Sequence, residues 1–204
     1  LEAAGAQVGL STCVVGIDDF YKPRQERLEL ARRVHPLFET RGPPGTHDTL
    51  TCRRAIASLG EAGPTELPLF DKGLDERVDS HVVEGPFDLV VLEGWCVGAR
   101  AAPEADLVEP VNALEREEDR VGRWRRHVNA ELAEHYEPIW QILDQIVYHE
   151  VPDLRAVRRW RLEQEEGRPT EQRLDAQAID RFVAHYERVT LDMLRRMPGE
   201  VDWN

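Results

Sequence analysis

The stretch that most constrains the fold is an almost uninterrupted apolar run from Phe87 to Leu92, which is followed by Glu93 and Gly94. Strands that are buried on both faces of a parallel sheet have this continuous apolar pattern, whereas half-buried strands alternate apolar and polar residues. We therefore predict a buried strand over 87–95 in a parallel sheet, with a carboxylate at its carboxyl end.

A second strand candidate covers residues 8–17 and is followed by two acids, Asp18 and Asp19. Ligands of open α/β sheets bind outside the carboxyl ends of the strands. Two adjacent carboxylates repel each other unless a cation or a proton-accepting role offsets the cost. A helix N-cap explains one of the acids but not easily both. We therefore favour a functional site, and if the two strands are parallel, their terminal acids emerge at the same edge.

The spacing of apolar residues predicts the other elements. We expect helices over 23–34, 49–59, 112–144, 154–166 and 175–197, a short strand over 145–150, and a polar break over 167–174. Residues 1–5 have the pattern of a last helical turn that ends at Gly5. Residues 67–77 have the composition of a short extended piece followed by a charged surface loop.

The composition limits the classes of function. A chain of 204 residues suits one domain, or one domain with a small lid. The net charge of -13 argues against a general nucleic-acid binder or a membrane-surface binder. No apolar run approaches the length of a membrane span, and no signal peptide is visible. The scattered Cys13, Cys52 and Cys96 indicate reduced, buried thiols, so we expect a cytoplasmic protein.

Two polar segments are candidates for ligand binding. The loop over 41–48 places an Arg, a His and an Asp beside a rigid Gly- and Pro-rich backbone, which favours a binding loop over a plain connector. The segment 115–126 alternates acids with arginines. It is either a solvated helix face with ion pairs or part of a lid at about 112–130 whose arginines, including Arg120 and Arg123, reach phosphate oxygens; both interpretations stay open.

The ordered set of motifs resembles the D-glycerate 3-kinase family, a group of P-loop kinases related to uridine kinase, phosphoribulokinase and pantothenate kinase. The motifs are Ile-Asp-Asp-Phe-Tyr at 17–21, Arg-Gly-Pro-Pro-Gly-Thr-His-Asp at 41–48, Pro-Leu-Phe-Asp-Lys at 68–72 with Arg77, Leu-Glu-Gly-Trp-Cys-Val-Gly at 92–98, and Val-Pro-Asp at 151–153 followed by Trp160 and Arg161. They span nearly the whole chain. The resemblance implies a three-layer α/β fold with a mainly parallel sheet, and the phosphorylation of D-glycerate to 3-phosphoglycerate by ATP with Mg²⁺.

The resemblance also implies roles for single residues. Asp18 would be the general base beside Mg²⁺, and Glu93 would hold the water shell of the ion. Arg41, His47 and Arg77 suit a small hydroxy-acid, with arginine forking onto its carboxylate. The residues implied to orient the hydroxyls or the arginines are Asp19, Tyr21, Asp48, Asp71 and Lys72. The adenine pocket is expected near 152–160.

The phosphate-binding signature of this family, G-x-x-x-x-G-K-[ST], is absent from the 204 residues. The family places it just before the helix whose end we expect at residues 1–5. We therefore expect 1–204 to be one truncated P-loop-kinase-like domain that lacks its first strand and is inactive alone. The rival hypotheses are a kinase for another small alcohol or a nucleoside, and a non-catalytic remnant that binds or regulates.

Overall fold

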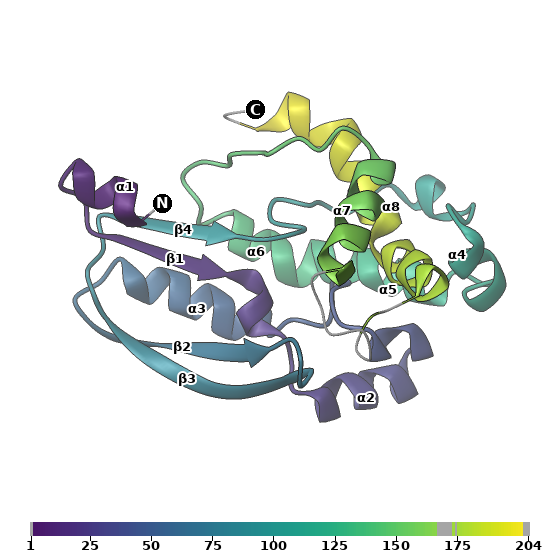
Figure 1. Ribbon diagram of the computed structural model, residues 1–204, viewed down its shortest axis with the longest axis horizontal. Helices are drawn as coiled ribbons and strands as arrows, with labels where there is room; N and C mark the ends of the chain where they lie inside the picture. Colours follow the sequence, from purple (N-terminus) through teal and green to yellow (C-terminus); the bar gives the residue numbers. More distant parts are fainter. Residues whose placement is uncertain (1, 167–172, 174, 202–204) are drawn as a thin grey trace.

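The computed structural model describes residues 2–166, 173 and 175–201. This α/β chain combines helices and strands up to β4 (Leu89–Glu93), and the described elements after β4 are all helical (Figure 1). In chain order they are α1 (Glu2–Gln7), β1 (Thr12–Gly16), α2 (Arg24–Arg33), α3 (Thr49–Leu59), β2 (Gly63–Asp71), β3 (Glu76–Gly85), β4 (Leu89–Glu93), α4 (Ala113–Glu118), α5 (Arg123–Glu131), α6 (Glu137–Trp140), α7 (Leu154–Glu166) and α8 (Ala176–Glu200). Short 3₁₀ turns cover Ile17–Phe20, Pro36–Glu39 and Glu104–Leu107, and a π-helical turn covers Leu132–Tyr136.

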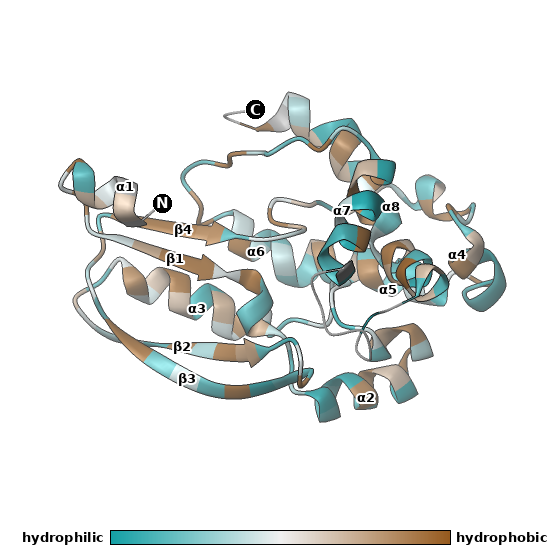
Figure 2. Cartoon of the chain, in the orientation of Figure 1, coloured by the Kyte–Doolittle hydropathy of each residue, from teal (hydrophilic) through white to brown (hydrophobic). Residues whose placement is uncertain are grey.

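Strands β1 and β4 pair in parallel, and their register places Gly16 opposite Glu93. The prediction that their acidic ends share one edge is therefore confirmed. Both strands are hydrophobic over most of their length (Figure 2). Alternation along β1 buries Cys13 and Val15 in the main core. Helix α3 lies between this pair and the β2–β3 hairpin and contacts both.

Strand β4 differs from the strand predicted over 87–95, because it is shorter and only partly buried. Val90, Val91 and Leu92 are half-buried, and Leu89 is 42% exposed. Within the described part of the chain, β4 pairs with β1 alone, and its residues line a cavity of about 1290 Å³. The continuous apolar pattern therefore reflects a strand with one face on the core and the other on this cavity.

The hairpin of β2 and β3 is the element that sequence analysis missed, since only a short extended piece and a loop were predicted over 67–77. Its two strands are antiparallel over their whole length. Thr65, Leu67 and Phe70 of β2 are buried. Strand β3 has no buried residue, and charged and polar residues interrupt its apolar ones, so it lacks the regular apolar alternation that identifies a strand from sequence.

Most predicted helices are confirmed as α2, α3, α7 and α8, and Asp48 caps α3 by accepting from the Thr51 N–H at 3.1 Å. The strand predicted over 145–150 is wrong: this segment is irregular and contributes apolar side chains to the cavity wall. Most of the predicted break at 167–174 lies outside the described residues.

The end of the first helix is also corrected. Gly5 lies inside α1 rather than ending it. Gly9 ends the helix with a φ of 80°, and the Leu10 N–H donates to the Gly5 carbonyl at 2.9 Å. This is the Schellman arrangement, in which a left-handed glycine lets the chain turn back onto the last carbonyls.

The predicted helical region 112–144 consists of short helices that pack against α8 and the core. Trp124 and Val128 are buried in the main core, and Arg188 of α8 reaches Glu115 at 2.6 Å. Core packing of this kind gives the proposed lid no direct support, so the lid stays a prediction. None of the described helices is both long and apolar enough to cross a membrane.

Candidate active site

Asp18 lies in the 3₁₀ turn directly after β1, and both of its carboxylate oxygens have a partner. Oδ1 accepts a hydrogen bond from the Tyr21 hydroxyl at 3.0 Å, and Oδ2 accepts from the Lys72 ammonium at 2.7 Å. Tyr21 is buried, whereas the Lys72 side chain is 58% exposed. The tyrosine is therefore a fixed partner, and the lysine is a partner that a ligand can displace.

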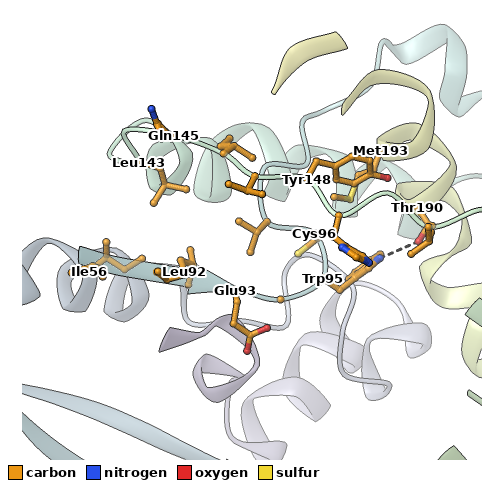
Figure 3. Close-up of a pocket in the computed structure, with 18 of the residues that line it drawn as sticks. Ile56, Leu92, Glu93, Trp95, Cys96, Leu143, Gln145, Tyr148, Thr190 and Met193 are labelled. Carbon is orange, nitrogen blue, oxygen red and sulfur yellow. Dashed lines mark hydrogen bonds between the residues drawn. The ribbon is translucent and has the colours of Figure 1, made fainter. Parts of the chain in front are cut away.

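A second pair of carboxylates, those of Asp19 and Glu93, flanks Gly16. A Cβ atom on Gly16 would lie 3.1 Å from Asp19 Oδ2 and 3.2 Å from Glu93 Oε1, so glycine leaves room between them. Figure 3 shows Glu93 at the end of β4 with its carboxylate directed away from Leu143 and Gln145.

Two carboxylates in this arrangement fit Mg²⁺, which is usually held by one or two carboxylates together with waters and phosphate oxygens. No cluster of three or more His, Cys, Asp or Glu side chains suited to a metal occurs among the residues that the structure describes. The carboxylates that flank Gly16 are Asp19 and Glu93, whereas the pair expected from sequence was Asp18 and Glu93, and Asp18 is paired with Tyr21 and Lys72.

The loop over 41–48 lies against the tip of β1, as a binding loop must. The Asp48 N–H donates to the Phe20 carbonyl at 2.7 Å, and the Lys22 N–H donates to the Thr46 carbonyl at 2.9 Å. The Lys22 ammonium also donates to the Gly45 carbonyl at 2.7 Å. These bonds hold the loop beside Asp18.

His47 is buried in this loop rather than open to a ligand. Its ring stacks on Tyr21 with centroids 4.3 Å apart, and its Nδ1 lies 2.6 Å from the Tyr136 hydroxyl. Burial lowers the pKa of His47 to about 3, so the ring is neutral at ordinary pH. A neutral buried ring supports Tyr21 and does not supply a cation for a carboxylate.

Tyr21 keeps its proton for the bond to Asp18. Burial raises the pKa of Tyr21 well above its ordinary value, and the nearby Asp18 carboxylate adds to this effect. The hydroxyl therefore remains a hydrogen-bond donor to Asp18 throughout the physiological pH range.

The two arginines expected to bind the acceptor border the site but already contact protein groups. Arg41 pairs with Asp75 at 2.6 Å and donates to the Lys72 carbonyl at 3.1 Å. Arg77 donates to the Tyr21 carbonyl at 2.9 Å and lies 3.6 Å from Asp48. Arg41 thus holds the hairpin turn that carries Lys72, and Arg77 ties β3 to the segment after Asp18.

Sequence reasoning missed two residues that organise this region. Asp75, at the turn between β2 and β3, has a φ of 56° and also pairs with Arg27 at 2.8 Å. Arg27 is fully buried and donates to the carbonyls of Lys22 and Glu39 at 3.2 and 3.1 Å. An arginine in a charged helix looks solvent-exposed in sequence, so no local signal identifies it.

Three predicted site residues lie elsewhere. Asp71 accepts from the N–H groups of its own turn, at 2.7 and 2.9 Å. Arg120 donates to a carbonyl of its own helical segment, and Arg123 donates to the Arg33 carbonyl at the end of α2 at 2.8 Å. Among the described contacts, none joins one of these three side chains to Asp18. Their roles in the site stay predictions.

The cavity beside β4 lies between that strand, the irregular segment 142–149, α7 and α8. The Trp95 Nε1–H donates to the Thr190 hydroxyl at 3.0 Å on its wall (Figure 3). Leu154 and Val157, from the region where the adenine pocket was expected, also line it. Glu93 belongs to this wall as well, so the cavity adjoins the carboxylates at the strand tips.

Two known proteins of similar sequence are named as kinases. No family model matches the chain. The chain is 31% identical over 191 residues to "Uncharacterized kinase mug58" of Schizosaccharomyces pombe, covering 83% of this chain and 65% of that protein. It is 29% identical over 195 residues to "D-glycerate 3-kinase, chloroplastic" of Arabidopsis thaliana, covering 86% of this chain and 39% of that protein. The chain is thus similar in sequence to two proteins named as kinases, one of them a D-glycerate 3-kinase.

A solved structure of D-glycerate 3-kinase from Cryptococcus neoformans superposes with a TM-score of 0.81 at 24% identity, covering 100% of this chain and 76% of that chain. The α/β P-loop kinase fold expected from the motifs is therefore confirmed. The chain spans 65% and 39% of the lengths of the two curated relatives.

Proposed function

We propose that the protein containing this chain is a kinase that transfers a phosphoryl group from ATP, with Mg²⁺, to D-glycerate and forms 3-phosphoglycerate. The observation that carries the proposal is Asp18, a carboxylate at the tip of a parallel strand that is oriented by Tyr21 and covered by a displaceable cation, Lys72. The names of the kinase relatives support it.

In the proposed reaction, Asp18 accepts the proton of the acceptor hydroxyl. Tyr21 keeps Oδ1 in place, while Lys72 leaves Oδ2 and its ammonium becomes available to the anionic part of the acceptor. The hydroxyl oxygen then forms a bond to the γ-phosphorus as the bond to ADP breaks. Little covalent chemistry is required of the protein, so positioning and charge neutralisation are its main contributions.

Asp19 and Glu93 are proposed to hold the water shell of Mg²⁺, which neutralises charge on the phosphates when it is bound. ATP is proposed to approach from the cavity side of β4, where Glu93 lies. A cytoplasmic location also remains a proposal, since the plant relative is named as chloroplastic.

Lys72, Arg41 and Arg77 favour an anionic acceptor, because charge-assisted hydrogen bonds give a small acid most of its affinity. The test is an ATP-dependent assay of the complete protein in which this chain occurs, with D-glycerate, glycerol and nucleosides as acceptors, and with Asp18→Asn as the inactive control. We expect turnover on glycerate, with glycerol poor.

Preference for a nucleoside or for glycerol would overturn the acceptor and favour a kinase of another small alcohol. Failure to phosphorylate any member of the panel, with ATP still bound, would instead support a non-catalytic binding protein. The position of the new phosphate on glycerate is read by ³¹P NMR of the product.

A further inference from the structure

The helical rod formed by α5 and α6 is interrupted by the π-helical turn Leu132–Tyr136. Its wider spacing is seen where the Glu137 N–H donates to the Leu132 carbonyl, five residues earlier. Pro138 follows and has no N–H for the carbonyl four residues before it, which gives a local reason for the irregular turn. Single π turns inside α-helices are frequent at functional sites.

The side chain of Tyr136, in the π turn, contacts the loop over 41–48. Tyr136 is fully buried, and its hydroxyl oxygen accepts from the Gly45 N–H at 3.1 Å. The same hydroxyl lies 2.6 Å from His47 Nδ1. Because burial raises the pKa of Tyr136 well above its ordinary value, the hydroxyl keeps its proton.

The short distance between the Tyr136 hydroxyl and His47 Nδ1 favours one donor over the other. Either tautomer of His47 leaves one buried donor without a partner, so counting bonds does not choose between them. Hydrogen bonds from a hydroxyl to an oxygen are typically about 2.7–2.8 Å long, whereas those from an N–H to an oxygen are about 2.9–3.0 Å, so a hydroxyl donor gives the shorter bond. A separation of 2.6 Å therefore favours donation by the Tyr136 hydroxyl to Nδ1, which places the His47 proton on Nε2.

His47 in turn supports the residue that orients the base. Its ring stacks on Tyr21 at an interplanar angle of 22°, and the Tyr21 hydroxyl donates to Asp18. Phe70 also packs edge-on against Tyr21, with the ring centroids 5.1 Å apart. The contacts from Tyr136 to Asp18 are therefore continuous.

We propose that Tyr136 is a positioning residue: its hydroxyl holds His47 in the Nε2–H tautomer, and the held ring keeps Tyr21 on Asp18. The kinetic part of this inference rests on the proposed function, whereas the tautomer does not depend on the identity of the acceptor.

The test is Tyr136→Phe in the complete protein, because this change keeps the ring and removes the hydroxyl. We expect the ¹⁵N spectrum of the wild-type His47 ring to show a protonated Nε2 and an Nδ1 that accepts a hydrogen bond, and we expect the variant to lose the Nδ1 signature. A misplacement of about 1 Å can cost roughly 10²-fold in rate, so kcat should fall about 10- to 100-fold while KM for ATP stays within about twofold.

Tyr186→Phe is the matched control. In the wild-type protein, the Tyr186 hydroxyl donates to the Arg41 carbonyl in the same loop at 2.9 Å. The substitution therefore removes a comparable hydrogen bond to the loop without changing a contact of His47. The His47 ¹⁵N signature should therefore stay at its wild-type value in this variant.

A protonated Nδ1 in the wild-type protein would overturn the inference, and this measurement needs no variant to fold. An unchanged His47 signature together with unchanged kcat in Tyr136→Phe would also overturn it. If glycerate is not phosphorylated at all, the proposed function fails while the spectra still decide the tautomer.

Discussion

The two sides of the β1–β4 strand tip differ in how they are prepared for a ligand. On the β1 side, Asp18, Tyr21 and His47 form a dense network of short contacts. On the β4 side, the strand lines a cavity of about 1290 Å³. The first side resembles a preorganised catalytic centre, and the second is an apolar concave surface of the kind that binds a larger ligand.

This contrast shows that the buried polar groups gather around Asp18, the residue proposed to accept a proton. The hairpin turn is anchored by Arg27 and Arg41 through Asp75, yet Lys72 in the same turn remains exposed. In the proposed reaction, this frame would position Asp18 while the exposed Lys72 moves aside for the acceptor.

The largest effect is expected from removing the base on the preorganised side. Asp18→Asn should lower kcat by about 10²–10⁴-fold with little change in KM for ATP, because a positioned general base contributes about that much. Steady-state kinetics with glycerate and ATP measure it, and Asp19→Asn, which leaves the base in place, should be milder. Activity within a few-fold of wild type in Asp18→Asn would show that Asp18 is only a structural acid.

Arg41→Met and Arg77→Met test whether these arginines, on the β1 side, bind the acceptor or only stabilise the protein. If they clamp the acceptor carboxylate, KM for glycerate should rise about 10–100-fold with KM for ATP nearly intact, since each charge-assisted bond is worth roughly 1.5–3 kcal/mol. Their contacts to Asp75 and Asp48 make a drop in melting temperature expected as well. A lower melting temperature with an unchanged KM for glycerate would assign both arginines to the scaffold alone.

The same substitution in neighbouring strands compares the two sides directly. Val15→Ala in β1 removes buried methyl groups and should lower the free energy of unfolding by about 2 kcal/mol. Val91→Ala in β4, which faces the cavity, should cost about 1 kcal/mol or less. Urea unfolding of both variants measures the difference. Equal losses would mean that the cavity side is filled in the complete protein.

The smallest effect concerns the buried His47. Its pKa is lowered from 6.5 to about 3 in the folded state, so the unfolded chain binds a proton first as the pH falls. Stability is therefore lost as the pH drops below about 6.5, at up to about 1.4 kcal/mol per pH unit for this group. Between pH 7 and 5.5 we expect His47→Gln to lose about 1 kcal/mol less than wild type in urea unfolding. Identical losses would contradict a neutral buried histidine.

The comparison also separates what was predictable from sequence. The two strands with acids at their carboxyl ends could be predicted from sequence, because an apolar run and the residues that end it are neighbours in the chain. The sequence placed both acids at one edge only if the two strands were parallel, and the structure shows that they are. Strand β3 was missed because charged and polar residues interrupt its valines and leave no regular apolar alternation.

The amino-acid sequence by itself determined the fold class, the loop over 41–48 and the acids at the strand tips, since these depend on local periodicity and motif order. Only the tertiary structure decided which partners those acids have. Lys72 reaches Asp18 from the hairpin, and Tyr136 reaches His47 from a π turn, across separations of 54 and 89 residues. The burial that makes His47 neutral comes from the same distant packing, because a side chain is desolvated by whatever the fold places around it.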